Sequence, residues 1–219
     1  MSSTKTPKKR FSSPLWLALL PWPAVAAGLF VFHSAFLAFL FYACGCLYGT
    51  WRLDGFSCPL RPKWSLRTHL TVASVSNLVL IGLYQFLGKW LLPADLLLER
   101  LATVGVTKAS FVWLFPYFLI GNPLVEELFW RGGLRLKSFI PGQPLPSLYV
   151  AFFFGAWHSL PIFLIAPLWV APLAVLGIMA IGFALAEVAD LTQTLGDAIL
   201  LHALAADLPL LIILWIASR

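Results

Sequence analysis

The stretch that decides the fold is residues 148–169, LYVAFFFGAWHSLPIFLIAPLW, which contains no Asp, Glu, Lys or Arg. A helix of about 20 apolar residues crosses the hydrocarbon core of a bilayer. Further long apolar runs cover residues 24–48 and 199–216. The 219-residue chain is 60% hydrophobic and only 11% charged, whereas soluble domains carry about 25% charged residues. Since the runs lack the polar–apolar alternation of barrel strands, the sequence predicts several membrane-crossing helices.

We therefore expect an all-α fold, a polytopic transmembrane helical bundle of about six membrane helices, with seven as the alternative count. Residues 1–13 form a polar, basic tail that we predict to be disordered. Residues 14–106 supply the N-terminal membrane helices. Residues 107–219 form a membrane core that contains most of the polar residues found inside apolar segments.

The helix count depends on residues 14–51, which are too long for one simple span. One interpretation is a short interfacial piece followed by a single helix over residues 24–48. The other is a tight hairpin of two short helices that turns near His33 and Ser34. No Gly, Asn or Pro cluster marks that midpoint, so we predict the single helix. Charge argues against the single helix, because that topology places a cluster of basic residues outside, contrary to the positive-inside rule. These residues are Arg52, Arg61, Lys63 and Arg67.

Pro, Gly, Asn and Asp delimit the remaining segments. Asn122-Pro123 predicts a new or kinked helix, with Asn122 as its N-cap. Thr194 and Asp197 resemble a capping box that opens the last helix. The other predicted elements are a loop at 51–63, a helix at 64–92 ended by Pro93, an amphipathic connector at 93–108, a helical stretch from 111 to 140, a turn at 141–144, and helices at 148–165 and 167–188.

The net charge is +6, and a cluster of basic residues precedes the first apolar run. Basic residues beside a membrane segment stay on the cytoplasmic side, so we predict a cytoplasmic N-terminus and contact with anionic membrane lipid. No folded basic surface accompanies the cluster, so we expect no nucleic-acid partner. The cluster comprises Lys5, Lys8, Lys9 and Arg10.

Ionisable residues inside membrane helices are costly and are functional candidates. Glu127 and Arg131 are four residues apart, with the acid first, which favours a helical ion pair. Glu126 points about 100° away from Glu127, so it stays free to act as a general base on water. His158 and His202, from later helices, would hold that water or stabilise an oxyanion. For His158 the alternative is a core histidine bonded to a backbone carbonyl.

Three motifs then form a recognisable set. Residues 126–132, EELFWRG, read EExxxRG, and residues 154–158, FGAWH, read FxxxH. Residues 194–202, TLGDAILLH, lead towards a third motif, HxxxN or HxxxD. Together they resemble the CPBP family of intramembrane endopeptidases, the CAAX prenyl endopeptidase and bacteriocin-processing (Abi-type) proteins. The resemblance covers about residues 107–215, and residues 14–106 match only as generic membrane helices.

The resemblance implies a glutamate-dependent protease with its active site inside the membrane. In the family the first Glu activates water, and the second Glu and the Arg support the site. Two histidines, with the Asn or Asp of the last motif, complete it. Carried over, these residues are Glu126, Glu127, Arg131, His158 and His202, and residues 107–219 become a CPBP-like catalytic core.

The last motif departs from the family pattern, because Ala206 stands four residues after His202. Asp207 follows, about 140° from His202 round an α-helix, against about 40° for position 206. Either the helix is locally wide, as in a π-bulge, and Asp207 joins the site, or the polar partner is missing. We include Asp207 among the candidate catalytic residues.

The predicted function is an intramembrane endopeptidase that cleaves membrane-associated peptides or lipidated proteins, including prenylated CAAX proteins. We predict no cofactor. Zinc is the alternative, since two His and a Glu can hold it, but the H-E-x-x-H spacing is absent. The alternative functions are a non-catalytic membrane adaptor or scaffold, favoured by Ala206, and a small proton-coupled transporter.

Overall fold

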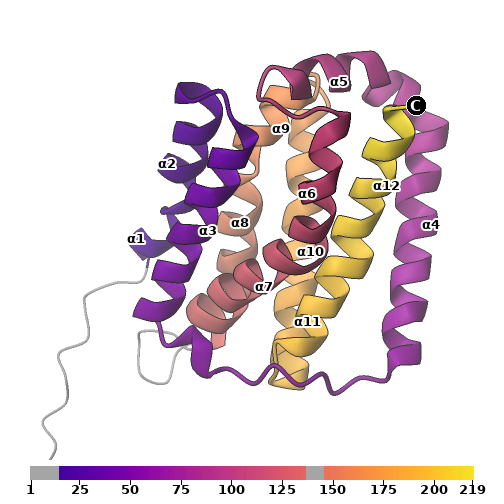
Figure 1. Ribbon diagram of the computed structural model, residues 1–219. Coiled ribbons are helices and arrows are strands. Elements are labelled where there is room, and N and C mark those ends of the chain that lie inside the picture. Colours follow the sequence, from indigo (N-terminus) through magenta and orange to yellow (C-terminus); the bar gives the residue numbers. More distant parts are fainter. Residues whose placement is uncertain (1–14, 137–145) are drawn as a thin grey trace, which may run out of the picture.

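The computed structural model describes residues 15–136 and 146–219, and these residues form helices joined by short loops, with no strand among them (Figure 1). The predicted tail at residues 1–13 and the predicted turn at 141–144 lie outside the described residues. The all-α helical bundle expected from the sequence is confirmed.

The elements fall into α-helices, short 3₁₀ turns (η2, η3) and wider π-helical segments (η1, η4, η5, η6). In chain order they are α1 (Leu15–Ala18), α2 (Pro21–Ala26), η1 (Ala27–Val31), α3 (Ala35–Arg52), η2 (Gly55–Ser57), α4 (Leu66–Leu91), α5 (Ala94–Ala102), η3 (Lys108–Ser110), α6 (Phe111–Pro116), η4 (Tyr117–Gly121), α7 (Asn122–Glu126), η5 (Glu127–Leu136), α8 (Ser147–Trp157), α9 (Ser159–Ile165), α10 (Ala171–Thr192), α11 (Gly196–Leu201), η6 (His202–Asp207) and α12 (Leu208–Ala217).

Four helical segments among the described residues are long and apolar enough to cross a membrane: Leu66–Gly88, Ser147–Ile165, Ala171–Thr192 and Gly196–Ala217. A shorter apolar helix covers Trp16–Val31. The helix from α6 to η5 runs alongside them through the middle of the bundle (Figure 1). Its charged residues face inward, so it carries polar groups into an otherwise apolar bundle.

The N-terminal helices form the hairpin, so the single helix predicted over residues 24–48 is wrong. His33 takes a positive φ of 49°, a conformation that Gly or Asn usually marks in a sequence. Ser34 then caps α3 by accepting the Leu37 N–H at 3.3 Å. The two arms pack closely, since a Cβ at Gly28 would lie 2.2 Å from the Ala38 Cα.

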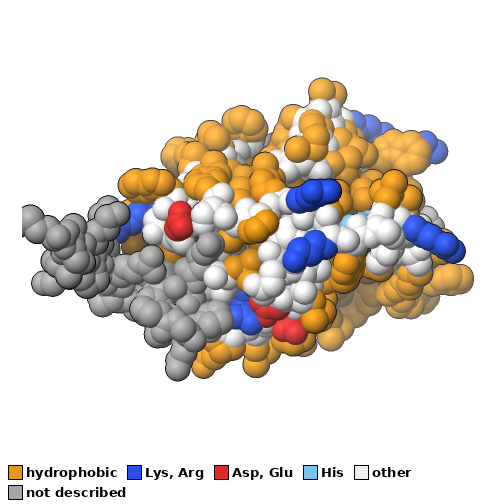
Figure 2. Space-filling view, turned by 90° about the horizontal axis from the view of Figure 1, so that it is seen from below, with side chains coloured by type: hydrophobic (Ala, Val, Ile, Leu, Met, Phe, Trp, Pro, Cys, Tyr) orange, Lys and Arg blue, Asp and Glu red, His pale blue; other side chains and the backbone are white. Residues whose placement is uncertain are grey.

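In the hairpin, α3 returns the chain to the lower end of the bundle in Figure 1. A crossing loop, residues 58–65, then runs along that end from η2 to α4 (Figure 1). Seen from below, Lys and Arg side chains stand out on this face (Figure 2). Arg61, Lys63 and Arg67 are exposed there, on the opposite end of the bundle from α5.

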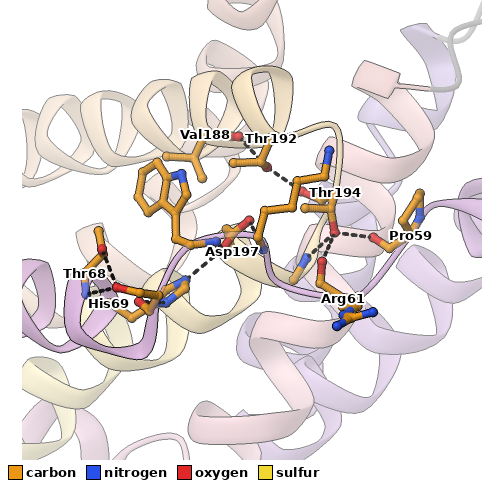
Figure 3. Close-up of polar contacts among 12 residues, drawn as sticks. Pro59, Arg61, Thr68, His69, Val188, Thr192, Thr194 and Asp197 are labelled. Carbon is orange, nitrogen blue, oxygen red and sulfur yellow. Dashed lines mark hydrogen bonds and ion pairs between the residues drawn. The ribbon is translucent and has the colours of Figure 1, made fainter.

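The crossing loop is fastened to the start of α11 (Figure 3). The Asp197 carboxylate accepts the N–H groups of Lys63 at 3.0 Å and Trp64 at 2.9 Å, and it pairs with His69 Nε2 at 3.0 Å. The capping box predicted for Thr194 and Asp197 is therefore wrong, because α11 begins after Leu195 without a side-chain cap. Backbone donors of the crossing loop occupy the carboxylate instead.

Asn122 was expected to cap a new or kinked helix. The segment α7 does begin at Asn122, but Asn122 does not act as its N-cap. It has helical φ and ψ of −62° and −52° inside a helix that continues from α6 to η5. Pro123 donates no backbone hydrogen bond, and the wide π turn at Tyr117–Gly121 accommodates the gap. The Asn122 side chain is buried in the bundle instead. By contrast, the helix end at Pro93 and the break after Ile165 are confirmed.

Candidate active site

The centre of the bundle holds two adjacent carboxylates and a guanidinium. Glu126, Glu127 and Arg131 are 1%, 0% and 0% exposed. The Arg131 Nη1 donates to Glu127 Oε1 at 2.9 Å, so the predicted ion pair is formed. Arg131 Nη2 also donates to the Gly182 carbonyl at 3.0 Å, and the guanidinium lies 4.3 Å from the centre of the Phe154 ring. These contacts compensate a buried charge that would otherwise be very costly.

His202 comes from η6 and meets both glutamates, as the sequence predicted. Its Nδ1 lies 2.7 Å from Glu127 Oε1, and its Nε2 lies 3.4 Å from Glu126 Oε2. Because Arg131 holds Glu127 as an ionised acceptor, the imidazole proton belongs on Nδ1. Glu127 therefore orients His202, and His202 directs Nε2 towards Glu126.

Asp207 reaches the site because η6 is π-helical from His202 to Asp207. The wider turn brings Asp207 Oδ1 to 3.6 Å from His202 Nε2. Of the two alternatives left open by the sequence, the locally wide helix is the one that forms. Asn122 Nδ2 donates to Asp207 Oδ2 at 3.2 Å, so the opposing helix also fixes this carboxylate.

His158 lies at the edge of this cluster. Its Nδ1 is 2.7 Å from the Phe154 carbonyl oxygen, which matches the core-histidine alternative. Its ring contacts the Phe154 ring, with centroids 4.9 Å apart, and the Phe154 ring contacts that of His202 at 6.1 Å. Among the described residues, aromatic contacts rather than a hydrogen bond link His158 to the carboxylates. A catalytic role for His158 stays a prediction.

Three residues of the site were missed by sequence reasoning. Tyr42, on α3, donates its hydroxyl proton to Glu126 Oε1, and Trp130 Nε1 donates to the Tyr42 oxygen at 3.1 Å. Asn122 was interpreted as a helix cap. Tyr42 is one of three hydroxyl-bearing residues in the apolar run at residues 24–48, and nothing in the sequence sets it apart from Ser34 and Tyr48.

Both glutamates keep one oxygen without a hydrogen bond among the described residues. Glu126 Oε2 and Glu127 Oε2 are buried acceptors with no hydrogen-bond partner. Buried polar atoms are nearly always paired, and an unpaired one calls for an explanation such as a catalytic role or a bound water. The arrangement is suited to hold a water molecule beside Glu126 and His202.

A metal site was the alternative to metal-free chemistry. Within residues 15–136 and 146–219, no group of three or more His, Cys, Asp or Glu side chains is placed to hold a metal ion. Tyr42 and Arg131 already occupy one oxygen of each glutamate. Metal-free catalysis stays a prediction.

Comparison with protein families supports the motif-based resemblance. Residues 108–206 match the model of the Rce1-like family, described as type II CAAX prenyl endopeptidase Rce1-like. The matched residues include Glu126, Glu127, Arg131, His158 and His202, whereas Tyr42 and Asp207 lie outside them. Comparisons with curated proteins and with solved structures found no match. The family match confirms the resemblance predicted from the motifs and supports, for this integral membrane protein, a CAAX-type intramembrane protease.

Proposed function

We propose that this protein is an intramembrane endopeptidase in which Glu126 activates the attacking water. The observation that carries the proposal is the contrast between the two glutamates. Glu127 is bonded to Arg131 and His202 through the same oxygen. Among the described residues both glutamates keep a free Oε2, but Glu126 has no charged donor at its bonded oxygen, only the neutral Tyr42 hydroxyl, and its Oε2 lies 3.4 Å from His202 Nε2. Glu126 is therefore the carboxylate that is available to take a proton.

In the proposed reaction, Glu126 Oε2 removes a proton from water while the water oxygen bonds to the carbonyl carbon of the substrate. The carbonyl oxygen becomes an oxyanion, which His202 stabilises through an Nε2–H group in its doubly protonated form, with the Nδ1–H donated to Glu127. Glu126 then returns its proton to the leaving nitrogen as the carbon–nitrogen bond breaks. Glu127 and Asp207 contact opposite nitrogens of His202, so together they fix the plane of its ring.

The substrate class follows from the family match and from the depth of the site. The Rce1-like description names CAAX prenyl endopeptidases, so we propose prenylated CAAX proteins as substrates. A prenyl group partitions into the bilayer and brings the adjacent peptide bond to the membrane. The carboxylate cluster lies inside a bundle of apolar helices, which supports a substrate that is itself held in the bilayer.

We further propose that the lower end of the bundle in Figure 1 faces the cytoplasm, together with the N-terminus. Basic residues beside membrane segments favour the cytoplasmic side. The exposed Arg61, Lys63 and Arg67 lie at that end. The hairpin permits this orientation, because it allows these residues to lie on the same side of the membrane as the N-terminus. The single helix predicted over residues 24–48 would place them on the opposite side.

The main argument for a non-catalytic adaptor was Ala206, and the structure weakens it. Asp207 takes the place beside His202 that the family motif assigns to position 206. No contact among the described residues separately favours the transporter alternative, which rested on buried carboxylates and on the helix break expected at Gly121-Asn122-Pro123.

Wild type and Glu126→Gln, expressed in matched membranes, test the proposal through the peptides that they release, measured by mass spectrometry. We expect a cleavage product with wild type that Glu126→Gln does not form. Glu99→Gln is the matched control, since Glu99 is an exposed carboxylate on α5, away from the site, and it should release the same product as wild type. Identical peptide sets for wild type and Glu126→Gln, with both proteins folded, would contradict the proposal.

A further inference from the structure

Tyr42 belongs to the part of the chain that the family match does not cover, yet it lies against the central carboxylate. It is 1% exposed, and α3 delivers it to the helix that carries Glu126. Its hydroxyl and the Trp130 indole form a short chain of hydrogen bonds that ends on Glu126 Oε1. Residues 108–206 therefore do not complete the site by themselves.

The direction of that chain is fixed by chemistry. An indole N–H is a donor only, so the Tyr42 oxygen must accept from Trp130. The single hydroxyl proton of Tyr42 is then directed to Glu126 Oε1. Since Oε1 is an acceptor in this contact, a proton taken up by Glu126 belongs on Oε2. That oxygen has no hydrogen-bond partner among the described residues and lies 3.4 Å from His202 Nε2.

We infer that Tyr42 is a positioning residue for the general base: its hydroxyl holds Glu126 so that Oε2 faces the attacking water. The inference rests on the proposed function, in which Glu126 takes that proton. During the reaction the water proton moves to Oε2 and later to the leaving nitrogen, while Tyr42 keeps its own proton throughout. The N-terminal hairpin thus contributes directly to catalysis as well as to membrane anchoring.

Packing holds the Tyr42 ring independently of its hydroxyl. The Trp157 ring lies against it with centroids 4.3 Å apart and an interplanar angle of 31°. Trp157 in turn lies 3.8 Å from the His158 ring. Tyr42→Phe therefore retains the ring contacts and removes the hydrogen bond to Glu126, which separates positioning from packing.

The test measures cleavage by purified protein in lipid nanodiscs, with a quenched fluorescent peptide that ends in a farnesylated CAAX sequence. For Tyr42→Phe we expect kcat to fall about 10-fold to 100-fold, as for a lost hydrogen bond to a charged group, while KM changes by less than about 2-fold. Tyr149→Phe is the matched control, because Tyr149 is 55% exposed on α8, and its kcat should equal that of wild type. A Tyr42→Phe protein with wild-type kcat overturns the inference.

A second measurement keeps the two proposals distinguishable. If wild type fails to cleave this peptide, the proposed substrate is wrong. The contact between Tyr42 and Glu126 is then tested by a double-mutant cycle, in which the Tm values of wild type, Tyr42→Phe, Glu126→Gln and the double variant are compared. Coupling predicts Tm changes that depart from additivity by about 2–4 °C for a chain of this size. Additive changes in Tm overturn the positioning role, and coupled changes support it without any cleavage.

Discussion

Two buried acid–histidine clusters in this protein differ in how completely their oxygens are bonded. At the lower end of the bundle, Asp197 contacts His69 and the backbone N–H groups of Lys63 and Trp64 (Figure 3). At the centre, Glu126 and Glu127 surround His202, and each keeps one oxygen without a hydrogen bond among the described residues. Both clusters are buried and both join distant segments of the chain.

This difference separates a structural carboxylate from a reactive one. Backbone donors bond both oxygens of Asp197, so they fasten the crossing loop to α11 and leave neither oxygen without a hydrogen bond. The central cluster instead retains buried acceptors, which are costly for folding and therefore mark a site that function maintains. We predict that variants at the two clusters divide accordingly between stability and catalysis.

The largest combined effect is expected for Arg131→Met, which leaves the Glu127 charge buried without its partner. Breaking one side of such a pair costs about 3–5 kcal/mol, so unfolding in detergent should occur much earlier, and cleavage should be lost. The double variant Arg131→Met/Glu127→Gln should regain most of the stability but not the activity. An Arg131→Met protein as stable as wild type would mean that the pair is not buried as described.

A smaller effect, mainly on catalysis, is expected at the end of η6. Asp207→Ala removes the carboxylate that lies 3.6 Å from His202 Nε2, and we expect kcat to fall about 100-fold, within the range for loss of one electrostatic group in a catalytic site. Ala206→Asn should leave kcat within about 2-fold of wild type, since Asp207 already occupies the position beside His202. A clear gain of activity in Ala206→Asn would show instead that η6 is an ordinary α-helix.

The smallest effect on catalysis is expected at the cluster of Asp197 and His69, at the lower end of the bundle. Asp197→Asn weakens the contacts with Lys63, Trp64 and His69 and should lower the free energy of unfolding by about 1–3 kcal/mol. The kcat of the folded fraction should stay within about 2-fold of wild type. Chemical denaturation followed by Trp fluorescence, beside the cleavage assay, measures both quantities. A 10-fold loss of kcat without loss of stability would place Asp197 in the catalytic machinery.

Local spacing predicted those features of the site that depend on one helix. The Glu127–Arg131 pair followed from their separation. The motif set assigned His202 to the same site as the glutamates, and its contacts with both of them come from the structure. The position of Asp207 was left open, because an ideal helical repeat places it away from His202 and the sequence does not announce a π-helical turn.

Features that depend on tertiary contacts were not predictable in the same way. His33 turns the chain without the Gly or Asn that usually marks a positive φ, so the single helix was preferred to the hairpin. Asp197 and Asn122 both match helix-cap patterns, but each bonds across the bundle instead, to the crossing loop and to Asp207. Tyr42 joins the site from a helix without any motif, and only the packing of α3 against the core reveals it.

The central claim is that the buried, unpaired oxygen of Glu126 makes this protein a protease. The most direct test compares purified wild type, Glu126→Gln and Glu99→Gln in nanodiscs with the farnesylated CAAX peptide, with products identified by mass. We predict that wild type and Glu99→Gln release the C-terminal fragment at equal rates. Glu126→Gln should be slower by about 10²–10⁴-fold, the contribution of a general base. Equal rates for Glu126→Gln and wild type, with both proteins folded, would contradict the claim.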